Sequence, residues 1–204
     1  MNTKSIYFTT EHYKFREEVQ KFLHQEISPF LEEWEAQRVI PGEFWEKMGA
    51  AGFLGLYYPK EFGGAQKDIF YSVIFLEELG KTGYTGFRMA VALHAYMATS
   101  YLSFIGSEEL KQQYLTFAIS GKKIAALGIS EAQAGSDLSN IQTTAILEKD
   151  HFIINGCKKY VINGTTADFI VLVVKTARTN IQSKRGESGL SLIVVDADLQ
   201  GIAV

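Results

Sequence analysis

A loop of small and polar residues, "SEAQAGSD" at positions 130–137, is the part of the sequence best suited to chemistry. A tight turn of small residues after a strand points several backbone N–H groups into one concavity, which favours anionic oxygens, especially those of phosphate. Ser130 and Ser136 add hydroxyl donors, and Gly135 with the alanines before it allows a ligand to approach closely. A plain connection between two strands, which needs Gly and Asp for its turn, explains the same residues. Local physics leaves both interpretations open and favours the plain connection.

The charged residues in and near this loop have ordinary structural explanations. We expect Glu131 to belong to the turn and Asp137 to accept backbone hydrogen bonds there, because short carboxylate side chains commonly do so. His94 lies alone in an apolar helical pattern and is expected to be a packed core residue. No group of Cys and His residues has the spacing of a metal site, so no metal is predicted. The glycine spacing of a Walker loop or of a dinucleotide GxGxxG motif is also absent.

The elements that must position the loop fall into two halves with different periods. Apolar residues recur at helical spacing over the first 120 positions. After Gly121 the pattern changes to short β-branched runs separated by turn residues: "KIAALGIS", "IQTTAILE", "HFIINGCKKYVING", "DFIVLVVKT" and "GLSLIVVD". The sequence therefore predicts an α+β protein, with an all-α helical bundle domain at 1–121 and an antiparallel, β-barrel-like domain at 122–204. The apolar, strand-like end "DADLQGIAV" predicts that this second domain is truncated.

Local signals set the expected boundaries of several elements. Thr10, Asp68 and Ser107 are predicted helix N-caps, since short polar side chains there can accept a hydrogen bond from the first turn. The tetrapeptide "EKDH" at 148–151 predicts a hairpin turn, and the polar segment 177–188 a surface loop.

Composition narrows the class of protein. The chain has 204 residues, 47% of them hydrophobic, and a net charge of −3, so no basic excess points to nucleic acid or to an anionic membrane. The apolar segment 87–106 is interrupted by Arg88, His94 and hydroxyl side chains, which favours a buried helix over a membrane span. A single cysteine, Cys157, excludes an internal disulfide framework and fits a reducing compartment. With no secretory signal pattern at the N-terminus, a soluble cytoplasmic protein is expected.

Four segments, taken in order, resemble the acyl-CoA dehydrogenase family. "GISEAQAGSDLSNIQTTA" is similar to the family signature [LV]-T-E-P-x-A-G-S-D, and "INGCKKYVINGTTADFIVLVVKT" to its second flavin motif, I-N-G-x-K-x-[WY]-[IV]-T-N-G. "GKTGYTGFRMAVALH" and "FIGSEELKQQYLTFAISGKKIAA" resemble the family's long helix and its helix-to-barrel junction. The resemblance implies a flavoprotein with an N-terminal helical domain, a middle β-domain and a C-terminal four-helix domain. This chain would contain the first domain and most of the second.

Carried over by position, the resemblance implies a set of FAD-binding residues. Ser130 matches a Thr whose hydroxyl and backbone bind the flavin's pyrimidine edge, and Ser136 lies near both the pyrophosphate and the acyl-CoA substrate. Ile162 stands where many members have a Thr, so it loses a side-chain donor close to the hydride-accepting nitrogen. The complete implied set adds the β-strand residues beside the flavin ring, the loop glycine and an aromatic that packs on the ring: Leu127, Ile129, Ser130, Gly135, Ser136, Tyr160 and Ile162.

The implied activity is the FAD-dependent α,β-dehydrogenation of an acyl-CoA or acyl-carrier thioester to a trans-2-enoyl thioester. The family's catalytic Glu usually lies in the C-terminal domain, so no catalytic base is assigned to these residues. An electron-transfer flavoprotein is the expected acceptor, and the complete protein is expected to be a homo-oligomer. Two alternatives stay open: an acyl-CoA oxidase, and a non-catalytic fragment that keeps the fold for binding or assembly.

Overall fold

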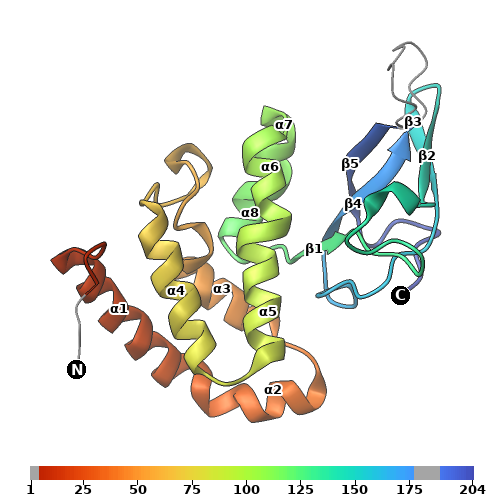
Figure 1. Cartoon of the computed structure of the whole chain (residues 1–204). Helices are drawn as coiled ribbons and strands as arrows, with labels where there is room; N and C mark the ends of the chain where they lie inside the picture. The colour runs from red at the N-terminus through yellow and green to blue at the C-terminus, as the bar shows by residue number, and fades with distance from the viewer. Residues whose placement is uncertain (1–4, 177–188) are drawn as a thin grey trace. The chain divides into compact units, whose positions relative to one another are not determined.

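The chain forms two compact units in the computed structural model, Met1–Ile124 and Ala125–Val204 (Figure 1). Residues 5–176 and 189–204 are described; the segment 177–188, predicted to be a surface loop, lies outside the described residues. The predicted α+β class is confirmed, because every helix longer than one turn belongs to the first unit and every strand to the second.

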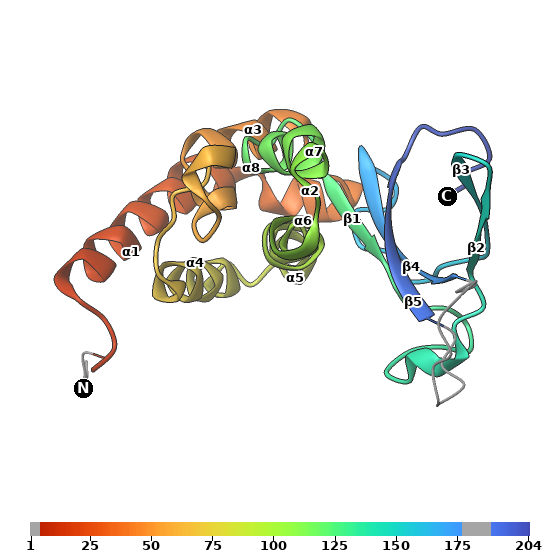
Figure 2. The same ribbon diagram turned by 90° about the horizontal axis from the view of Figure 1, so that it is seen from above.

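All the regular secondary structure in the described part of the first unit is helical. A π-helical turn, His94–Ala98, joins α5 to α6 into one rod, which is seen end-on in Figure 2. A second π-helical turn, Lys111–Leu115, joins α7 to α8 in the same way. The α-helices are α1 Thr10–Phe22, α2 Leu31–Gln37, α3 Gly42–Ala50, α4 Ile69–Lys81, α5 Thr85–Leu93, α6 Thr99–Ile105, α7 Glu108–Leu110 and α8 Thr116–Ile119.

Side-chain caps begin three of these helices. Asp68 accepts from the N–H of Phe70, and Ser107 from that of Leu110, as predicted. The prediction of Thr10 as the cap of α1 is wrong by one residue. Thr9 has the extended backbone of a cap. Its side chain accepts a hydrogen bond from the His12 backbone N–H, and the His12 ring accepts one from the Thr9 backbone N–H. Two adjacent threonines give the same sequence signal, and the capping partner three residues on decides between them.

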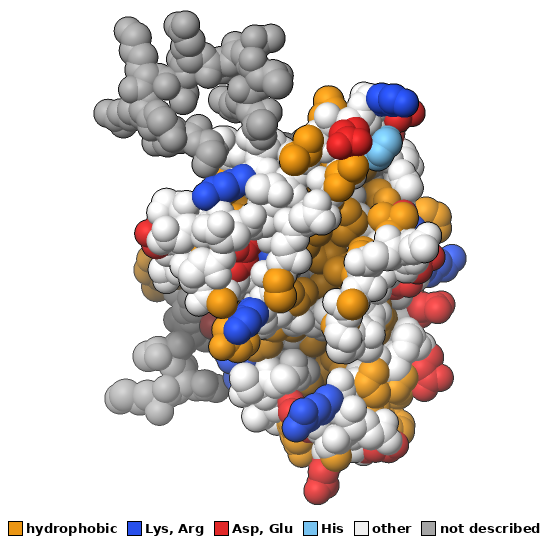
Figure 3. Space-filling model, turned by 90° about the vertical axis from the view of Figure 1, so that its right-hand side faces the viewer, with side chains coloured by type: hydrophobic (Ala, Val, Ile, Leu, Met, Phe, Trp, Pro, Cys, Tyr) orange, Lys and Arg blue, Asp and Glu red, His pale blue; other side chains and the backbone are white. Residues whose placement is uncertain are grey.

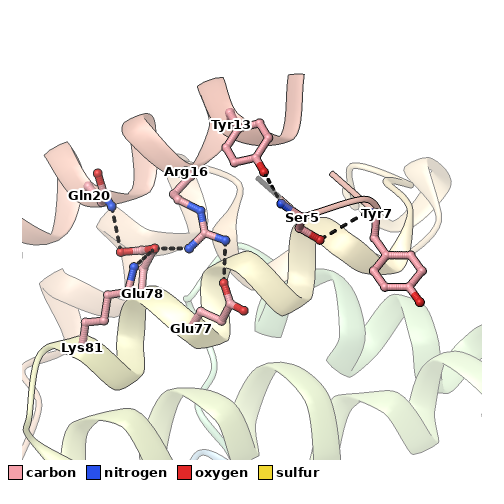
Figure 4. A network of polar contacts seen from close by, with 8 residues as sticks. All are labelled: Ser5, Tyr7, Tyr13, Arg16, Gln20, Glu77, Glu78 and Lys81. Carbon is pink, nitrogen blue, oxygen red and sulfur yellow. Dashed lines mark hydrogen bonds and ion pairs between the residues drawn. The ribbon is translucent and has the colours of Figure 1, made fainter. Parts of the chain in front are cut away.

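An ion-pair network fastens α1 to α4 (Figure 4). The Arg16 guanidinium contacts the carboxylates of Glu77 and Glu78, and Glu78 also accepts hydrogen bonds from Gln20 at 3.1 Å and Lys81 at 2.6 Å. The Glu78 side chain is only 3% exposed. Burial raises its pKa, but the donors Lys81, Gln20 and Arg16 outweigh burial, so the pKa lies below its ordinary value.

The predicted packed role of His94 is confirmed. Its side chain is fully buried, its ring lies 4.8 Å from that of Trp45, and its Nε2 donates to the Ala118 carbonyl at 3.0 Å. Within residues 5–176 and 189–204, no helix is long and apolar enough to cross a membrane.

The second unit is built on one five-stranded sheet. Its strands are β1 Ala125–Gly128, β2 Thr144–Glu148, β3 His151–Asn155, β4 Phe169–Thr176 and β5 Gly189–Asp196. The hairpin between β2 and β3 is confirmed, with Lys149 at φ 56 in its two-residue turn. The sheet is mixed, however, and not purely antiparallel, since β1 and β2 both run parallel to β4. Consecutive β-branched runs show where strands lie but not their direction.

The register explains the parallel pairs. Strand β5 occupies one side of β4 over its whole length, from Phe169 to Thr176. On the other side β1 pairs with Phe169–Leu172 and β2 with Lys175 and Thr176. β1 and β2 thus follow one another along the same edge of β4. The chain between them, 129–143, is an excursion that leaves this edge and returns to it.

Two irregular segments cover the two faces of the sheet. Alternate residues of β4 point to opposite faces. On one face Ile170 packs with Ala126 and Val195, and the loop residues Val161 and Ala167 lie against them. On the other face Val173 packs with Ala134 and Ile141 of the excursion. The core of this unit therefore includes both segments that carry the sequence motifs.

The β2–β3 hairpin reaches beyond this core. Its cross-strand pairs Ile146–Ile153 and Leu147–Phe152 hold four apolar side chains, each between 38% and 62% exposed. Hydrophobic side chains are accordingly visible on the face drawn in Figure 3.

Candidate functional site

The loop after β1 is closed by its own backbone. Glu131 N–H donates to the Ala134 carbonyl at 2.8 Å, and Ala134 N–H returns a hydrogen bond to the Glu131 carbonyl at 3.3 Å. Ala134 is buried in the sheet core, which anchors the turn. Gly135 and Ser136 follow at the surface. The predicted role of Asp137 is confirmed, because its carboxylate accepts from the backbone N–H of Ser139 at 2.9 Å.

Glu131 belongs to this turn, as predicted, but its side chain does more than close it. The carboxylate is 2% exposed and forms an ion pair with Lys158 at 2.8 Å. It also accepts from the backbone N–H groups of Gln142, at 2.6 Å, and Thr143, at 3.0 Å, and from the Thr143 hydroxyl. Burial raises the pKa of Glu131, but these donors outweigh burial and hold it at about 2. Glu131 is therefore a fully engaged carboxylate and is unsuited to accept a substrate proton.

Three interactions of two neighbouring lysines hold the second motif against the first. Lys158 Nζ, besides pairing with Glu131, donates to the Ile129 carbonyl at 3.1 Å. Next to it, Lys159 N–H donates to the Ser130 carbonyl at 2.7 Å. Farther along, Asn163 Nδ2 donates to the Ala125 carbonyl at 3.2 Å. These bonds hold the segment 159–163 beside β1 and the residues that follow it.

The second motif is not the strand that its sequence predicts. After β3 ends at Asn155, the residues "GCKKYVING" form no strand: the chain is irregular as far as Val161, and a turn begins at Ile162. Tyr160 (59°) and Asn163 (64°) have positive φ, and Gly164 N–H donates to the Val161 carbonyl. Gly156 is required here, since a Cβ would lie 2.3 Å from the Thr143 hydroxyl. Positive φ values interrupt a strand ladder, which β-branched composition cannot reveal. The two motifs lie side by side, but only the first begins on a strand.

The residues implied to bind FAD differ in how far they are exposed to a ligand. Leu127 is buried in β1 and can offer a ligand only its backbone, whereas Ile129 is half-buried and packs partly against the core. Ser130 is half-buried and Ile162 is half-buried within a turn. Tyr160 is 90% exposed. The structure thus brings both segments together, while sequence reasoning missed Lys158 and Thr143, whose contacts with Glu131 have no motif spacing.

Gly135 and Tyr160 are not explained by the packing of the fold. A Cβ on Gly135 would meet no atom within 4 Å, and its φ lies outside the left-handed region. Tyr160 has a left-handed backbone, which is uncommon for a bulky residue, and its ring makes no ring contact with the described residues. Strained, exposed residues such as Tyr160 cluster at ligand sites. These residues fit the close approach of a flat, anionic cofactor such as FAD.

Comparison with known proteins agrees with this geometry. The family profile described as "Acyl-CoA dehydrogenase, N-terminal domain" matches residues 9–122, and that described as "Acyl-CoA dehydrogenase, middle domain" matches residues 126–204. A short-chain specific acyl-CoA dehydrogenase of Clostridium acetobutylicum is 36% identical over 197 residues, which are 96% of this chain and 50% of that protein. A rat mitochondrial long-chain specific acyl-CoA dehydrogenase is 33% identical and is covered to 44% of its length.

Solved structures give the same result. An acyl-CoA dehydrogenase from Geobacillus kaustophilus superposes with a TM-score of 0.88 at 39% identity, covering 97% of this chain and 51% of that one. An acyl-CoA dehydrogenase from Bacillus anthracis, complexed with FAD, superposes with a TM-score of 0.85 at 27% identity and covers 96% and 33% of the two chains. The present chain spans about half the length of the curated relatives it matches. It belongs to the acyl-CoA dehydrogenase family, whose N-terminal and middle domains it matches.

Proposed function

We propose that this chain supplies the flavin-binding portion of an FAD-dependent dehydrogenase that converts an acyl-CoA or acyl-carrier thioester to a trans-2-enoyl thioester. In this proposal residues 1–121 form the helical domain and residues 122–204 the domain that binds flavin and acyl thioester. The observation that supports it best is that hydrogen bonds hold the two motif segments next to each other beside β1. Ser130 and Ser136 belong to one of these segments, and Tyr160 belongs to the other.

Each residue has a role that its surroundings permit. The Ser130 and Ser136 hydroxyls accept no hydrogen bond and donate none within the described part of the chain, so both can serve a ligand. The open surface at Gly135 allows a pyrophosphate to reach the backbone. Tyr160 offers an exposed ring that can pack on a flavin. Ile162 offers its backbone N–H in place of a side-chain donor.

When bound, FAD would accept hydride from the carbon β to the thioester carbonyl. The residues described here then orient the flavin and the thioester and exclude water from one side of them. We assign no catalytic base among these residues, in keeping with the buried, fully paired state of Glu131. An electron-transfer flavoprotein as electron acceptor, a cytoplasmic location and a homo-oligomeric complete protein remain parts of the proposal.

Flavin binding is the first test. Purified protein is titrated with FAD and the quenching of flavin fluorescence gives the dissociation constant; we expect weak but saturable binding. Replacing Tyr160 with Ala should weaken it about ten-fold, or about 1.4 kcal/mol. Leu147→Ala removes another exposed apolar side chain of the same unit and should leave the affinity unchanged. A titration without saturable quenching of the flavin fluorescence would contradict the proposal.

Activity is tested separately on the flavin-loaded protein. Bleaching of the flavin absorbance by an acyl-CoA without oxygen would support dehydrogenation and exclude a non-catalytic fragment. Rapid recovery of the colour in air would identify an acyl-CoA oxidase, whereas recovery only with an electron-transfer flavoprotein would support the dehydrogenase. Flavin binding without bleaching would show that this chain is a binding portion alone.

A further inference from the structure

We propose that Glu131 and Lys158 are positioning residues, whose buried ion pair fixes the spacing between the loop 130–136 and the segment 158–164. The inference rests on the proposed function only in naming flavin as the ligand that needs this spacing. The pair touches neither segment's exposed ligand groups, so it acts through the backbone that it holds.

The contacts of the pair join three separate stretches of chain. Glu131 opens the loop after β1 and accepts from the backbone N–H groups of Gln142 and Thr143, at the return of the excursion. Lys158 joins this carboxylate from the second motif and also holds the Ile129 carbonyl. One buried carboxylate thus ties the beginning of the excursion, its end and the second motif together. The β2–β3 ladder pairs Thr144 with Asn155, but in the described part of the chain no ladder joins the loop 130–136 to the segment 158–164.

Stability alone is a poor reason for such a pair. Removing two charges from water costs about as much free energy as their attraction returns, and apolar residues of similar size often stabilise a core better. An ion pair differs from apolar packing in its direction, because each hydrogen bond requires a particular placement of donor and acceptor. With Glu131 2% and Lys158 7% exposed, water cannot replace either partner without moving the backbone.

The bond between Lys159 N–H and the Ser130 carbonyl provides a direct measure of the spacing. It joins the two segments beside the pair and does not involve the side chains of either Glu131 or Lys158. Amide hydrogen exchange at Lys159 therefore reports whether the segments stay together. Exchange at the β4 amides, such as that of Leu172, reports whether the sheet remains folded.

Substitutions at two neighbouring lysines test the proposal on the full chain. Lys158→Met should raise the exchange rate of the Lys159 amide about ten-fold or more, since about one hydrogen bond's worth of local stability is lost, and should leave β4 protected. Lys159→Met removes the same charge from the exposed neighbouring position and should change neither. Lys158→Arg should restore part of the protection. Glu131→Gln, which keeps the size of the side chain, should raise the exchange rate of the Lys159 amide as Lys158→Met does. It replaces Lys158→Met as the test if the Lys158→Met protein does not fold.

A double variant that removes both charges distinguishes the effect of the pair on the spacing of the segments from its effect on stability. In Glu131→Gln with Lys158→Met no unpaired buried charge remains, so the midpoint of unfolding should recover towards that of the parent chain. The Lys159 amide should stay exposed to exchange, and the FAD dissociation constant should stay about ten-fold raised. Recovery of both protection and affinity would overturn the positioning role and leave only a structural one.

Two other results would also overturn it: unchanged protection of the Lys159 amide in Lys158→Met and Glu131→Gln, or equal loss of protection at Lys159 and throughout β4. A parent chain that binds no FAD would defeat the proposed function. The amide measurements need no flavin and would still decide whether the pair fixes the spacing.

Discussion

The packing of the protein does not explain Gly135 or Tyr160, and this is why we propose that both contact a ligand. Most glycines near the motifs have a reason within the protein: a Cβ at Gly128 would lie 2.6 Å from Leu172, and one at Gly156 would strike Thr143. Gly135 has open space and an ordinary φ. Gly42 is equally open, so open space alone does not indicate a ligand; Gly135 differs because it lies in the loop between Ser130 and Ser136 that we propose binds FAD.

This argument predicts opposite effects of Gly135→Ala on stability and on binding. The substitution should raise the free energy of unfolding of the β unit by about 0.4–1 kcal/mol, because it restricts the unfolded chain at a position where Ala fits. It should also weaken FAD binding, since the new methyl group enters the open space in which the proposed function places the ligand. Urea unfolding and the flavin titration measure the two effects. Gly42→Ala, at a similarly open glycine of the helical unit, should leave FAD affinity unaltered; equal affinities for the parent and Gly135→Ala would contradict the ligand role of this glycine.

His94 carries a second prediction at this scale. Burial lowers its pKa to about 4 from the ordinary 6.5, although the bond to the Ala118 carbonyl acts in the opposite direction. As the pH falls, the unfolded chain therefore takes up the proton first, and unfolding becomes easier. The free energy of unfolding should fall from pH 6.5 towards pH 4 by at most about 1.4 kcal/mol per pH unit from this residue.

The variant His94→Gln should lack this component of the pH dependence. Its stability relative to the parent chain is measured by urea unfolding with tryptophan fluorescence, since Trp45 contacts the His94 ring. The parent's advantage should be largest above pH 6.5 and shrink as the pH approaches 4. His24→Gln, at an exposed histidine, serves as the control. A difference between parent and His94→Gln that does not vary with pH would refute the buried neutral state of His94.

At the scale of elements, the sequence predicts features that depend on neighbouring residues, such as helix caps and hairpins. It does not predict features that depend on the tertiary fold. Asp68 and Ser107 cap helices because the cap partner lies within the next turn, and the 148–151 hairpin follows from its own residues. The turns around Tyr160 and Asn163 could not be foreseen, since neither residue requires a positive φ.

The same limit applies to the candidate site. Motif resemblance indicated which residues to examine around Ser130 and Tyr160, because a motif is a local pattern. The ion pair of Glu131 with Lys158 joins residues 27 positions apart, and the parallel direction of β1 and β2 depends on where the whole excursion returns. Both are products of the tertiary fold and have no local pattern.

The ion pairs between α1 and α4 give a prediction at this scale. Arg16→Ala removes a partner of Glu78 but leaves that carboxylate buried with Lys81 and Gln20. We expect the helical unit to lose about 1–3 kcal/mol, the cost of an unsatisfied buried polar group. Lys14→Ala breaks the Lys14–Glu11 pair on the same helix, where both side chains are more than 60% exposed, and should cost much less, because water screens an exposed pair. Urea unfolding followed by tryptophan fluorescence measures both, and equal losses would show that the Arg16 network contributes no more than a surface pair.

For the whole molecule, the division into two compact units carries the last prediction. Each unit has its own buried core, with Trp34 and Trp45 in the helical unit and Phe169 fully buried in the β unit. The chain's two tryptophans both belong to the first unit, so their fluorescence reports on that unit alone. Phe169→Ala should destabilise the β unit by about 3–5 kcal/mol through the cavity it leaves.

If the units unfold independently, Phe169→Ala should lower the urea midpoint seen by exchange at the β4 amides and leave the tryptophan midpoint unchanged. Phe75→Ala, at an equally buried phenylalanine of the helical unit, is the matched control and should do the reverse. A tryptophan midpoint that falls with Phe169→Ala would show that the two units unfold as one. Independent unfolding would in addition allow every substitution at the motif segments to be judged against an internal standard, since the helical unit of the same molecule would report any general effect on stability.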